Sequence, residues 1–426
     1  MSPTRNQNHR APTAALLLLA ALALGCRSNP IFRTARVHSA VPRDPLPPDA
    51  RAEPAPAMGT PPAALPHPVT GAVALAEAAT LGNDAPRLYA RFCSLCHGPE
   101  GKGYAADNAP SLVSSTFLES ATPEFLAASI AQGRPGTAMG AYARAVGGPL
   151  LPAQVDALVT WLRRNAPPRI SEPAVPPGGN MARGQAFFAL KCQKCHGTPA
   201  QRATAVHLFN PLLLQQASDD YLVHAIRQGR PGTDMVAWRE TLEPLQIADI
   251  LAYLRSVAQP VAAVATPPAP PPALPWTESP VIHPKGKPAD FKLKDGRLVK
   301  PEDVHRALQA KRRIVILDAR PPSDWLRLHI PGSQSLPYYD MANLDKVPND
   351  GTWVIAYCAC PHHASGAVVD ELRKRGYAHT AVMDEGIFAY QHKGFEVVVS
   401  KDNLPSAAPP PPPALQHGPL PLGPRP

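Results

Sequence analysis

Seven cysteines occur in the chain of 426 residues, and four of them form two short motifs that a histidine completes. The motifs are Cys93-Ser-Leu-Cys96-His97 and Cys192-Gln-Lys-Cys195-His196. Two thiols one helical turn apart can add to the two vinyl groups of a haem, and the adjacent histidine then faces the iron. A zinc site would need further ligands such as a second cysteine pair, and neither segment contains one. The motifs therefore predict two covalently bound haem c groups.

A longer repeat supplies a methionine after each motif. Gln132-Gly-Arg-Pro-Gly-Thr-Ala-Met139 recurs as Gln228-Gly-Arg-Pro-Gly-Thr-Asp-Met235. These methionines lie 42 and 39 residues after their histidines, and the Gly-Arg-Pro-Gly turn before each indicates a loop rather than a helix. Met181 is the only competing methionine in either segment. We expect His97 with Met139, and His196 with Met235, to be the axial ligands of the two irons.

The order of helix, attachment motif, methionine loop and closing helix resembles class I cytochromes c. The resemblance covers residues 81–166 and 181–258 through their whole length. It implies two all-α domains whose six-coordinate irons transfer electrons, because no coordination position is open to O₂ or nitrite. Dihaem enzymes that oxidise thiosulfate characteristically use a cysteine as an axial ligand, and neither segment has a spare cysteine.

The same resemblance makes finer predictions. The closing helices are expected at residues 152–165 and 244–257, with Trp161 and Tyr253 on their haem-facing sides. Pro110 and Pro211 resemble the family's proline, whose carbonyl accepts a hydrogen bond from the proximal imidazole. Such a contact fixes the orientation and basicity of the ring.

The segment 286–400 has a different pattern, in which apolar runs alternate with amphipathic stretches. Strands are expected at Ile314–Leu317, Trp353–Tyr357 and Ala381–Met383, with helices beginning at Pro301 and closing near Arg375. Strands that alternate with helices predict a parallel α/β sheet.

This segment resembles rhodanese-like domains. The resemblance is carried by Leu317-Asp-Ala-Arg320, His329-Ile-Pro-Gly-Ser333, Tyr357-Cys358, Gly376-Tyr377 and Glu385-Gly-Ile-Phe-Ala-Tyr390. In that family a cysteine at the end of the central strand takes sulfane sulfur as a persulfide, and Cys358 matches this position. The anion is held by backbone N–H groups of a loop that opens a helix. The loop here is one residue longer than usual and lacks the common arginine, so a persulfide donor or a carrier role fits better than thiosulfate as the donor.

Cys360 leaves the chemistry of this loop open. It could resolve a persulfide on Cys358, act as the nucleophile itself, or share a copper or zinc ion with Cys358, His362 and His363. A docking or redox-sensing module without catalysis is the alternative to sulfur transfer, so enzymatic activity is uncertain. Asp318 and Arg320 form a further charged pair in this segment. We expect these two residues to brace the sheet rather than to react.

The N-terminus has the pattern of an export signal. Arg5 and Arg10 precede an apolar run from Ala14 to Leu24 that is too short to cross a bilayer. Leu24-Gly25-Cys26 resembles the lipobox of bacterial lipoproteins, in which the cysteine becomes lipidated. The resemblance implies a signal peptide at residues 1–25, a lipid anchor on Cys26 and a periplasmic location. The absence of aspartate after Cys26 favours the outer membrane.

Proline-rich segments separate the three domains. The chain has 56 prolines, concentrated in a tether at 26–80, linkers at 167–180 and 259–285, and a tail at 401–426. The net charge of +9 is distributed over all parts of the chain, whereas a nucleic-acid-binding domain concentrates its basic residues. The expected partners are therefore periplasmic redox proteins and a sulfane-sulfur donor, and nucleic acid is excluded.

Overall fold

The computed structural model describes residues 80–103, 109–258, 276, 279–359 and 362–399. The predicted signal peptide, Cys26, nearly all of the 26–80 tether, most of the 259–285 linker, Cys360 and the 401–426 tail lie outside the described residues. Within the described part, no helix combines the length and the apolar character needed to cross a membrane.

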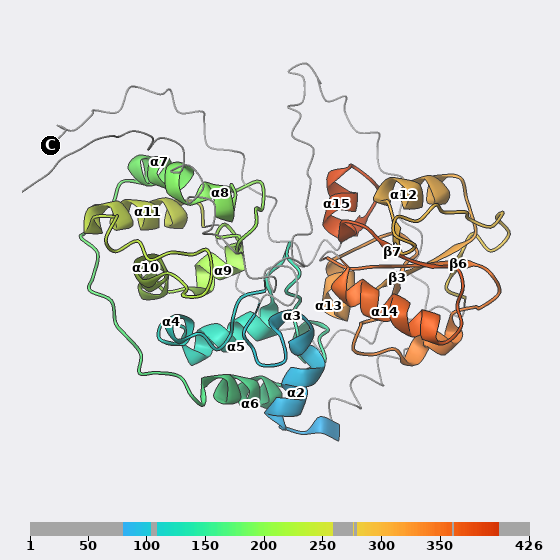
Figure 1. The fold of residues 1–426 in the computed structure, drawn as a ribbon, viewed down its shortest axis with the longest axis horizontal. Helices are drawn as coiled ribbons and strands as arrows, with labels where there is room; N and C mark the ends of the chain where they lie inside the picture. The colour runs from blue at the N-terminus through green and yellow to red at the C-terminus, as the bar shows by residue number, and fades with distance from the viewer. Residues whose placement is uncertain (1–79, 104–108, 259–275, 277–278, 360–361, 400–426) are drawn as a thin grey trace, which may run out of the picture. The chain divides into compact units, whose positions relative to one another are not determined.

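The first block, residues 81–166, is built of helices joined by loops (Figure 1). The helices are α2 (Ala85–Phe92), α3 (Ser94–His97), α4 (Ser115–Leu118), α5 (Pro123–Gln132) and α6 (Pro152–Arg163), with a 3-10 turn η2 at Arg144–Val146. The side chain of Asp84 accepts the backbone N–H of Arg87 at 3.2 Å, and that of Thr122 accepts the N–H of Phe125 at 3.0 Å. These capping bonds, together with a proline in the first turn, explain why α2 and α5 begin where they do.

The second block, residues 181–258, repeats the same order of helices. Its helices are α7 (Met181–Lys191), α8 (Gln193–His196), α9 (Pro211–Gln216), α10 (Asp219–Gln228) and α11 (Pro244–Ser256). The closing helices α6 and α11 begin alike, because Gln154 accepts the backbone N–H of Leu151 and Gln246 accepts that of Glu243, both at 2.9 Å. Both closing helices therefore form where the sequence predicts them, and each ends one or two residues earlier.

The helices α7 and α11 of the second block pack unusually closely. A Cβ atom on Gly184 of α7 would lie 1.9 Å from the carbonyl oxygen of Asp249 in α11, so only glycine fits there. The ring of Phe188 lies 5.0 Å from that of Phe209 and 5.6 Å from that of Tyr253. This aromatic cluster fills the core directly before the second attachment motif.

The two helical blocks contact each other through α4, α5 and α10. The ring of Tyr221 lies 4.7 Å from that of Phe125 and 6.3 Å from that of Phe117. Beside these rings, the fully buried His224 contacts Glu172 at 2.8 Å and Glu119 at 3.1 Å. The linker 167–180 therefore contributes a carboxylate to the contact between the blocks, in addition to connecting them.

The third block is an α/β domain. Its strands are β1 (Val281–Ile282), β2 (Leu298–Val299), β3 (Ile314–Asp318), β4 (Leu328–His329), β5 (Gln334–Ser335), β6 (Trp353–Tyr357), β7 (Thr380–Met383) and β8 (Val398–Val399). The main sheet has the order β1-β3-β6-β7-β2, with β5 also paired to β3. All pairs within it are parallel except that of β1 with β3, and β4 pairs with β8 separately. The predicted parallel sheet is confirmed, and it has one antiparallel edge.

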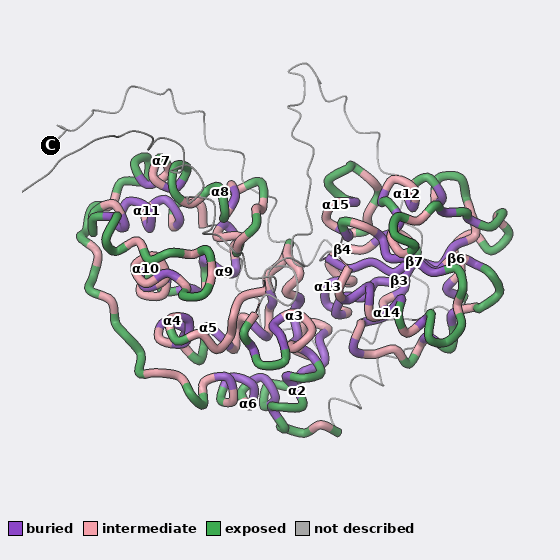
Figure 2. The backbone as a smooth tube through the Cα atoms, viewed as in Figure 1, coloured by how far each residue is buried: buried purple, intermediate pink, exposed green. Residues whose placement is uncertain are grey.

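Helices cover both faces of this sheet. They are α12 (Pro301–Gln309), α13 (Pro322–Arg327), α14 (His363–Lys374) and α15 (Gly386–His392), and a 3-10 helix η3 spans Ala342–Lys346. Ile314 and Ile316 of β3 belong to the core beneath α12 and α15, whereas Val315 and Leu317 belong to the core beneath α14. This alternation follows from the two-residue period of a strand. β3 is buried along its whole length, as Figure 2 shows.

Among the described residues, hydrogen bonds join the first block to the second, as between Arg134 and Gln216, and to the third, as between Phe92 and Tyr338.

Candidate functional site

Each attachment motif occupies one short helix directly after a longer one. The backbone of Cys93 bends at the end of α2, with φ −119° and ψ −36°, and Cys192 bends almost identically at the end of α7. The N–H of His97 donates to the carbonyl of Cys93 at 3.0 Å, and that of His196 to the carbonyl of Cys192 at 2.9 Å. The turn therefore brings the two thiols and the imidazole of each motif together.

The imidazole of His97 is oriented by a backbone carbonyl. Its Nδ1 lies 2.9 Å from the oxygen of Pro110, and because a carbonyl only accepts, Nδ1 carries the proton. Nε2 is then the basic nitrogen that can bind iron. Burial lowers the pKa of His97, which keeps the ring neutral at pH 7.

His196 is oriented in the same way, but by a different residue than predicted. Its Nδ1 donates to the carbonyl of Val206 at 2.7 Å, and burial lowers its pKa as well. The expectation for Pro211 is wrong, because Pro211 is the first residue of α9, where Asn210 caps the helix through the N–H of Leu213. A shorter connection in the second block places the carbonyl of Val206 beside the ring.

The two methionine loops have one common backbone structure. In the first, Arg134 N–H donates to the carbonyl of Met139 at 2.7 Å; in the second, Arg230 N–H donates to that of Met235 at 2.8 Å. Further matching bonds join Thr137 and Thr233 to their loops: each hydroxyl donates to the arginine carbonyl at 2.7 Å and accepts the methionine N–H at 3.1 Å. Both methionines are half-buried.

A glycine before each arginine makes this loop possible. Gly133 and Gly229 have φ of +65° and +64°, which favours glycine, and a Cβ on either would lie within about 2.6 Å of the loop's own backbone. The repeat found in the sequence thus corresponds to a repeated ring of backbone that holds each methionine.

The first thiol of each attachment motif lies in surroundings that oppose its ionisation. Burial, with a smaller effect from the neighbouring cysteine, raises the pKa of Cys93 to about 12 and that of Cys192 to about 11. Redox-active Cys-x-x-Cys pairs have a lowered thiol pKa instead. A neutral histidine with a free Nε2, a thioether donor and an unionised first thiol in each block fit covalent haem c.

Cys358 follows β6 directly, as predicted, and is 1% exposed. Its side chain belongs to the core beneath α14, and its Sγ lies 3.2 Å from Oγ of Ser365 in the first turn of α14. His362 precedes this helix with φ +77° and contacts the carboxylate of Asp384 at 2.7 Å. Sequence reasoning missed the contacts of Ser365 and Asp384, although a strand end followed by a helix start brings such residues together.

The proposed metal site in this loop has no complete ligand set among the described residues. They include no group of three or more histidine, cysteine, aspartate or glutamate side chains that could hold a metal ion, and Cys360 lies outside them.

Asp318 and Arg320 form a buried pair with an N–O distance of 2.6 Å. Arg320 also donates to the carbonyl of Leu328, and the nearby carboxylate holds the pKa of Arg320 above its usual value despite burial. These contacts agree with the expected bracing role.

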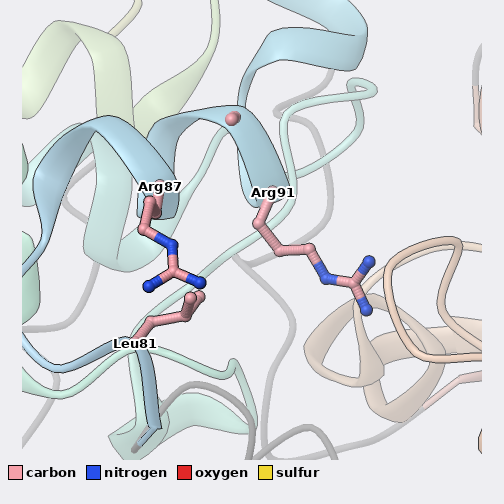
Figure 3. A pocket seen from close by; sticks show the side chains of 4 residues that line it. Leu81, Arg87 and Arg91 are labelled. Carbon is pink, nitrogen blue, oxygen red and sulfur yellow. The ribbon is translucent and has the colours of Figure 1, made fainter.

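A shallow pocket of about 310 Å³ lies on the first block, lined by Leu81, Arg87, Ala90 and Arg91 (Figure 3). None of the predicted haem or sulfur residues lines it.

Family models match all three blocks. The model for cytochrome c oxidase, cbb3-type, subunit III matches residues 81–162 and again 179–254, and the rhodanese-like domain model matches residues 300–393. The chain contains two cytochrome c domains and a rhodanese-like domain. The multidomain layout expected from the sequence is therefore confirmed. Cytochrome c domains carry covalently bound haem c.

Individual relatives resemble parts of the chain. A cbb3-type cytochrome c oxidase subunit CcoP of Azospirillum sp. (strain B510) is 27% identical over 184 residues, which are 39% of this chain and 58% of the relative. The chain thus matches somewhat more than half the length of that relative.

Among solved structures, a chain of the reducing HAO-like protein complex of Kuenenia stuttgartiensis is 18% identical, with a TM-score of 0.30, over 41% of this chain and 96% of its own. The rhodanese-like domain of an Anabaena protein is 18% identical, with a TM-score of 0.24, over 30% of this chain and 98% of its own.

Proposed function

We propose that the protein is a periplasmic, lipid-anchored electron carrier with two haem c groups, and that its rhodanese-like domain handles sulfane sulfur through Cys358. The strongest support for electron transfer is the duplicated ligand geometry. Both attachment histidines donate Nδ1–H to a backbone carbonyl, and both methionine loops are closed by the same bonds.

The haem supplies one-electron chemistry when it is bound, and the residues of this chain hold it in place. Cys93, Cys96 and His97 would attach and ligate one group, and Met139 would supply a further ligand. Cys192, Cys195, His196 and Met235 would do the same for the second group. Two histidine and methionine pairs leave no coordination position for a substrate, which favours electron transfer over haem catalysis.

The proposed location rests on the N-terminal sequence and on the matched relative. Leu24-Gly25-Cys26 has the form of a lipobox, and a lipid on Cys26 would anchor the chain at a bacterial membrane, with the outer membrane favoured. The similarity to an oxidase subunit supports membrane association and redox protein partners. A tether at 26–80 would let the cytochrome domains reach those partners.

The proposed sulfur chemistry is transfer from a persulfide donor. The thiolate of Cys358 takes the outer sulfur of the donor, the donor leaves as a thiol, and Cys358 becomes a persulfide. The position of Cys358 between β6 and α14 supports this role. Its 1% exposure favours the alternative that the domain is a docking or redox-sensing module of a pure electron carrier.

Stopped-flow absorbance of the oxidised holoprotein, mixed with thiosulfate or with glutathione persulfide, tests both proposals. Haem reduction that disappears in Cys358→Ala would support a sulfur-handling electron carrier. If neither donor reduces the haems and Cys358 forms no persulfide, while dithionite reduces both haems, the docking alternative holds. A pyridine haemochrome assay should give two haem c groups per chain.

A further inference from the structure

The two cytochrome domains differ at one face, although their backbones correspond there. Tyr142 N–H donates to the carbonyl of Ile130, and Trp238 N–H donates to that of Ile226, which aligns the residues after the two methionines. The attachment motifs align the residues around the cysteines. At this face, each residue of the first domain has an equivalent in the second. The equivalent positions, first domain before second, are Phe92 and Lys191, Leu95 and Lys194, Ala138 and Asp234, Gly140 and Val236, Ala141 and Ala237, and Tyr142 and Trp238.

In the first domain, the rhodanese-like domain covers this face. Leu95, between the attachment cysteines, packs against the core beneath α14 that also contains Cys358. Tyr338 OH donates to the carbonyl of Phe92 at 2.7 Å, and Ser323 Oγ donates to that of Ala141 at 2.7 Å. One neighbouring domain thus contacts both the attachment motif and the methionine loop, so these two segments share one face.

The contact is tightly packed. A Cβ on Gly140 would lie 2.7 Å from Oδ2 of Asp324 and 2.8 Å from Cγ of Pro321. The Phe92 ring lies 5.1 Å from that of Tyr339, which is 2% exposed. A redox protein could reach this face only after the rhodanese-like domain had moved away.

In the second domain, the described residues at the corresponding positions are exposed. Val236, in place of Gly140, is 57% exposed, and Leu190 beside the attachment motif is 74% exposed. Lys191 and Lys194 are also exposed, and neither forms an ion pair with another described residue. Asp234 is the acidic residue of this face. Nearby, Arg239 and Glu240 pair with each other at 3.2 Å.

We propose that Leu190, Lys191, Lys194 and Val236 form a docking surface, the second-domain port, for an acidic electron-transfer protein. Exposed apolar side chains beside unpaired lysines suit a partner with a small apolar contact and an acidic rim. The first domain exchanges electrons only within the chain, because its equivalent face is occupied. The port rests on the proposed electron-transfer function and assigns it a partner class.

A kinetic experiment with the holoprotein tests the port. The reduced protein is mixed with an oxidised acidic blue copper protein of the plastocyanin type, and haem oxidation is followed at low ionic strength. The double variant Lys191→Glu and Lys194→Glu should lower the second-order rate constant at least tenfold, with a weaker dependence on salt. The matched control, Arg87→Glu with Lys102→Glu on the first domain, makes the same change in net charge at exposed positions away from the port.

Each outcome has a definite meaning. An equal loss of rate in both double variants would show that net charge alone acts, and would overturn the port. An unchanged rate in the lysine variant would overturn it as well. Hexacyanoferrate(III) serves as a small oxidant that needs no docking surface. If hexacyanoferrate(III) oxidises the wild type and the lysine variant still reacts at the wild-type rate with the copper protein, the port is wrong but the electron-transfer function stands. If neither oxidant reacts, electron transfer itself fails.

Hydroxyl-radical footprinting of the holoprotein checks the asymmetry without mutation. Leu190 and Val236 should be oxidised readily, whereas Phe92 and Leu95 should be protected. Equal labelling of Leu95 and Leu190 would show that the first domain's face is also open, and would remove the reason to assign the port to the second domain.

Discussion

The two attachment histidines are held by backbone carbonyls rather than by side chains. Pro110 serves His97 and Val206 serves His196, so the proton on each Nδ1 does not depend on a titrating partner. Burial lowers the pKa of both rings, and the neutral form is the one that binds iron. Haem ligation by these residues should therefore be insensitive to pH above about 7.

The two methionines proposed as iron ligands can be tested separately. Met139→Ala and Met235→Ala should each abolish one methionine-to-iron absorption band in the far red and lower the reduction potential of one haem, because a thioether ligand favours ferrous iron. Redox titration with optical detection measures both effects. Met181→Ala is the control and should retain both bands. Full retention in either ligand variant would contradict the assignment.

Ser365 offers a test of the sulfur site. Its hydroxyl lies 3.2 Å from Sγ of Cys358 and would stabilise a thiolate or persulfide there. Because a hydrogen bond to a charged group contributes roughly 1.5–3 kcal/mol, Ser365→Ala should slow persulfide formation about tenfold or more. Ser365→Thr keeps the hydroxyl and should react nearly normally. Equal rates in Ser365→Ala and the wild type would mean that Cys358 does not react in this position.

The residues proposed to bind haem could be selected from the sequence because covalent attachment requires two thiols and a histidine at fixed spacing. The carbonyl of Val206 could not, since every residue has a carbonyl and only the path of the loop decides which one reaches His196. The same holds for Ser365, whose role depends on where α14 begins.

Among the elements, the two methionine loops depend on each other. Arg134 donates to the side-chain oxygen of Gln216 in the second domain at 2.7 Å, and Arg230 donates to the carbonyl of Thr116 in the first at 3.2 Å. Each methionine loop is therefore hydrogen-bonded to the other domain, so a substitution that breaks one of these bonds should alter the position of the methionine in the opposite domain's loop.

The contact between α7 and α11 predicts a sensitive position. Gly184→Val would force the helices apart, because even a Cβ would overlap the carbonyl of Asp249. Overpacking of this kind costs about 1–3 kcal/mol, which denaturant unfolding of the holoprotein would measure. The equivalent residue in the first domain, Ala85, already carries a Cβ. Ala85→Gly should cost about 1 kcal/mol or less, and a larger loss than in Gly184→Val would contradict this account.

The principal strands of the rhodanese-like domain were predictable, because β3, β6 and β7 contain apolar runs of three to five residues. The strands β1, β2, β4, β5 and β8 have two residues each, too few to show a period in the sequence. The antiparallel edge formed by β1 was missed for this reason.

At the scale of the whole molecule, a buried carboxyl group lies where two domains meet. Asp324 is 8% exposed, and its Oδ2, near Gly140, has no hydrogen-bond partner in the described part of the chain. Burial raises the pKa of Asp324, while Arg320 and Arg327 act in the opposite direction. The protonated carboxyl of Asp324 therefore favours the folded state. Its contribution to the free energy of unfolding is fully present below the pKa of Asp324 in the unfolded chain, and it is lost as the pH rises through the higher pKa in the folded state.

Asp324→Asn should therefore be more stable than the wild type at pH 7, by about 1.4 kcal/mol for each unit of raised pKa, and equally stable near pH 3. Thermal unfolding at a series of pH values measures the difference. Asp345→Asn, at a side chain that is 85% exposed, is the control for the loss of one negative charge at the surface. A gain that persists at pH 3 would point to packing rather than ionisation.

The chain between the cytochrome domains is bound along the protein surface. Ile170 N–H donates to the carbonyl of Glu119, and the Glu172 carboxylate contacts His224, Arg227 and Gln228. A protease needs an extended, accessible backbone, and this one is held at several points. The cytochrome pair should therefore survive limited digestion as one fragment. If the connection were cut, these same contacts would still hold the two halves together, so the proposed electron exchange between the two cytochrome domains would not depend on an intact peptide bond.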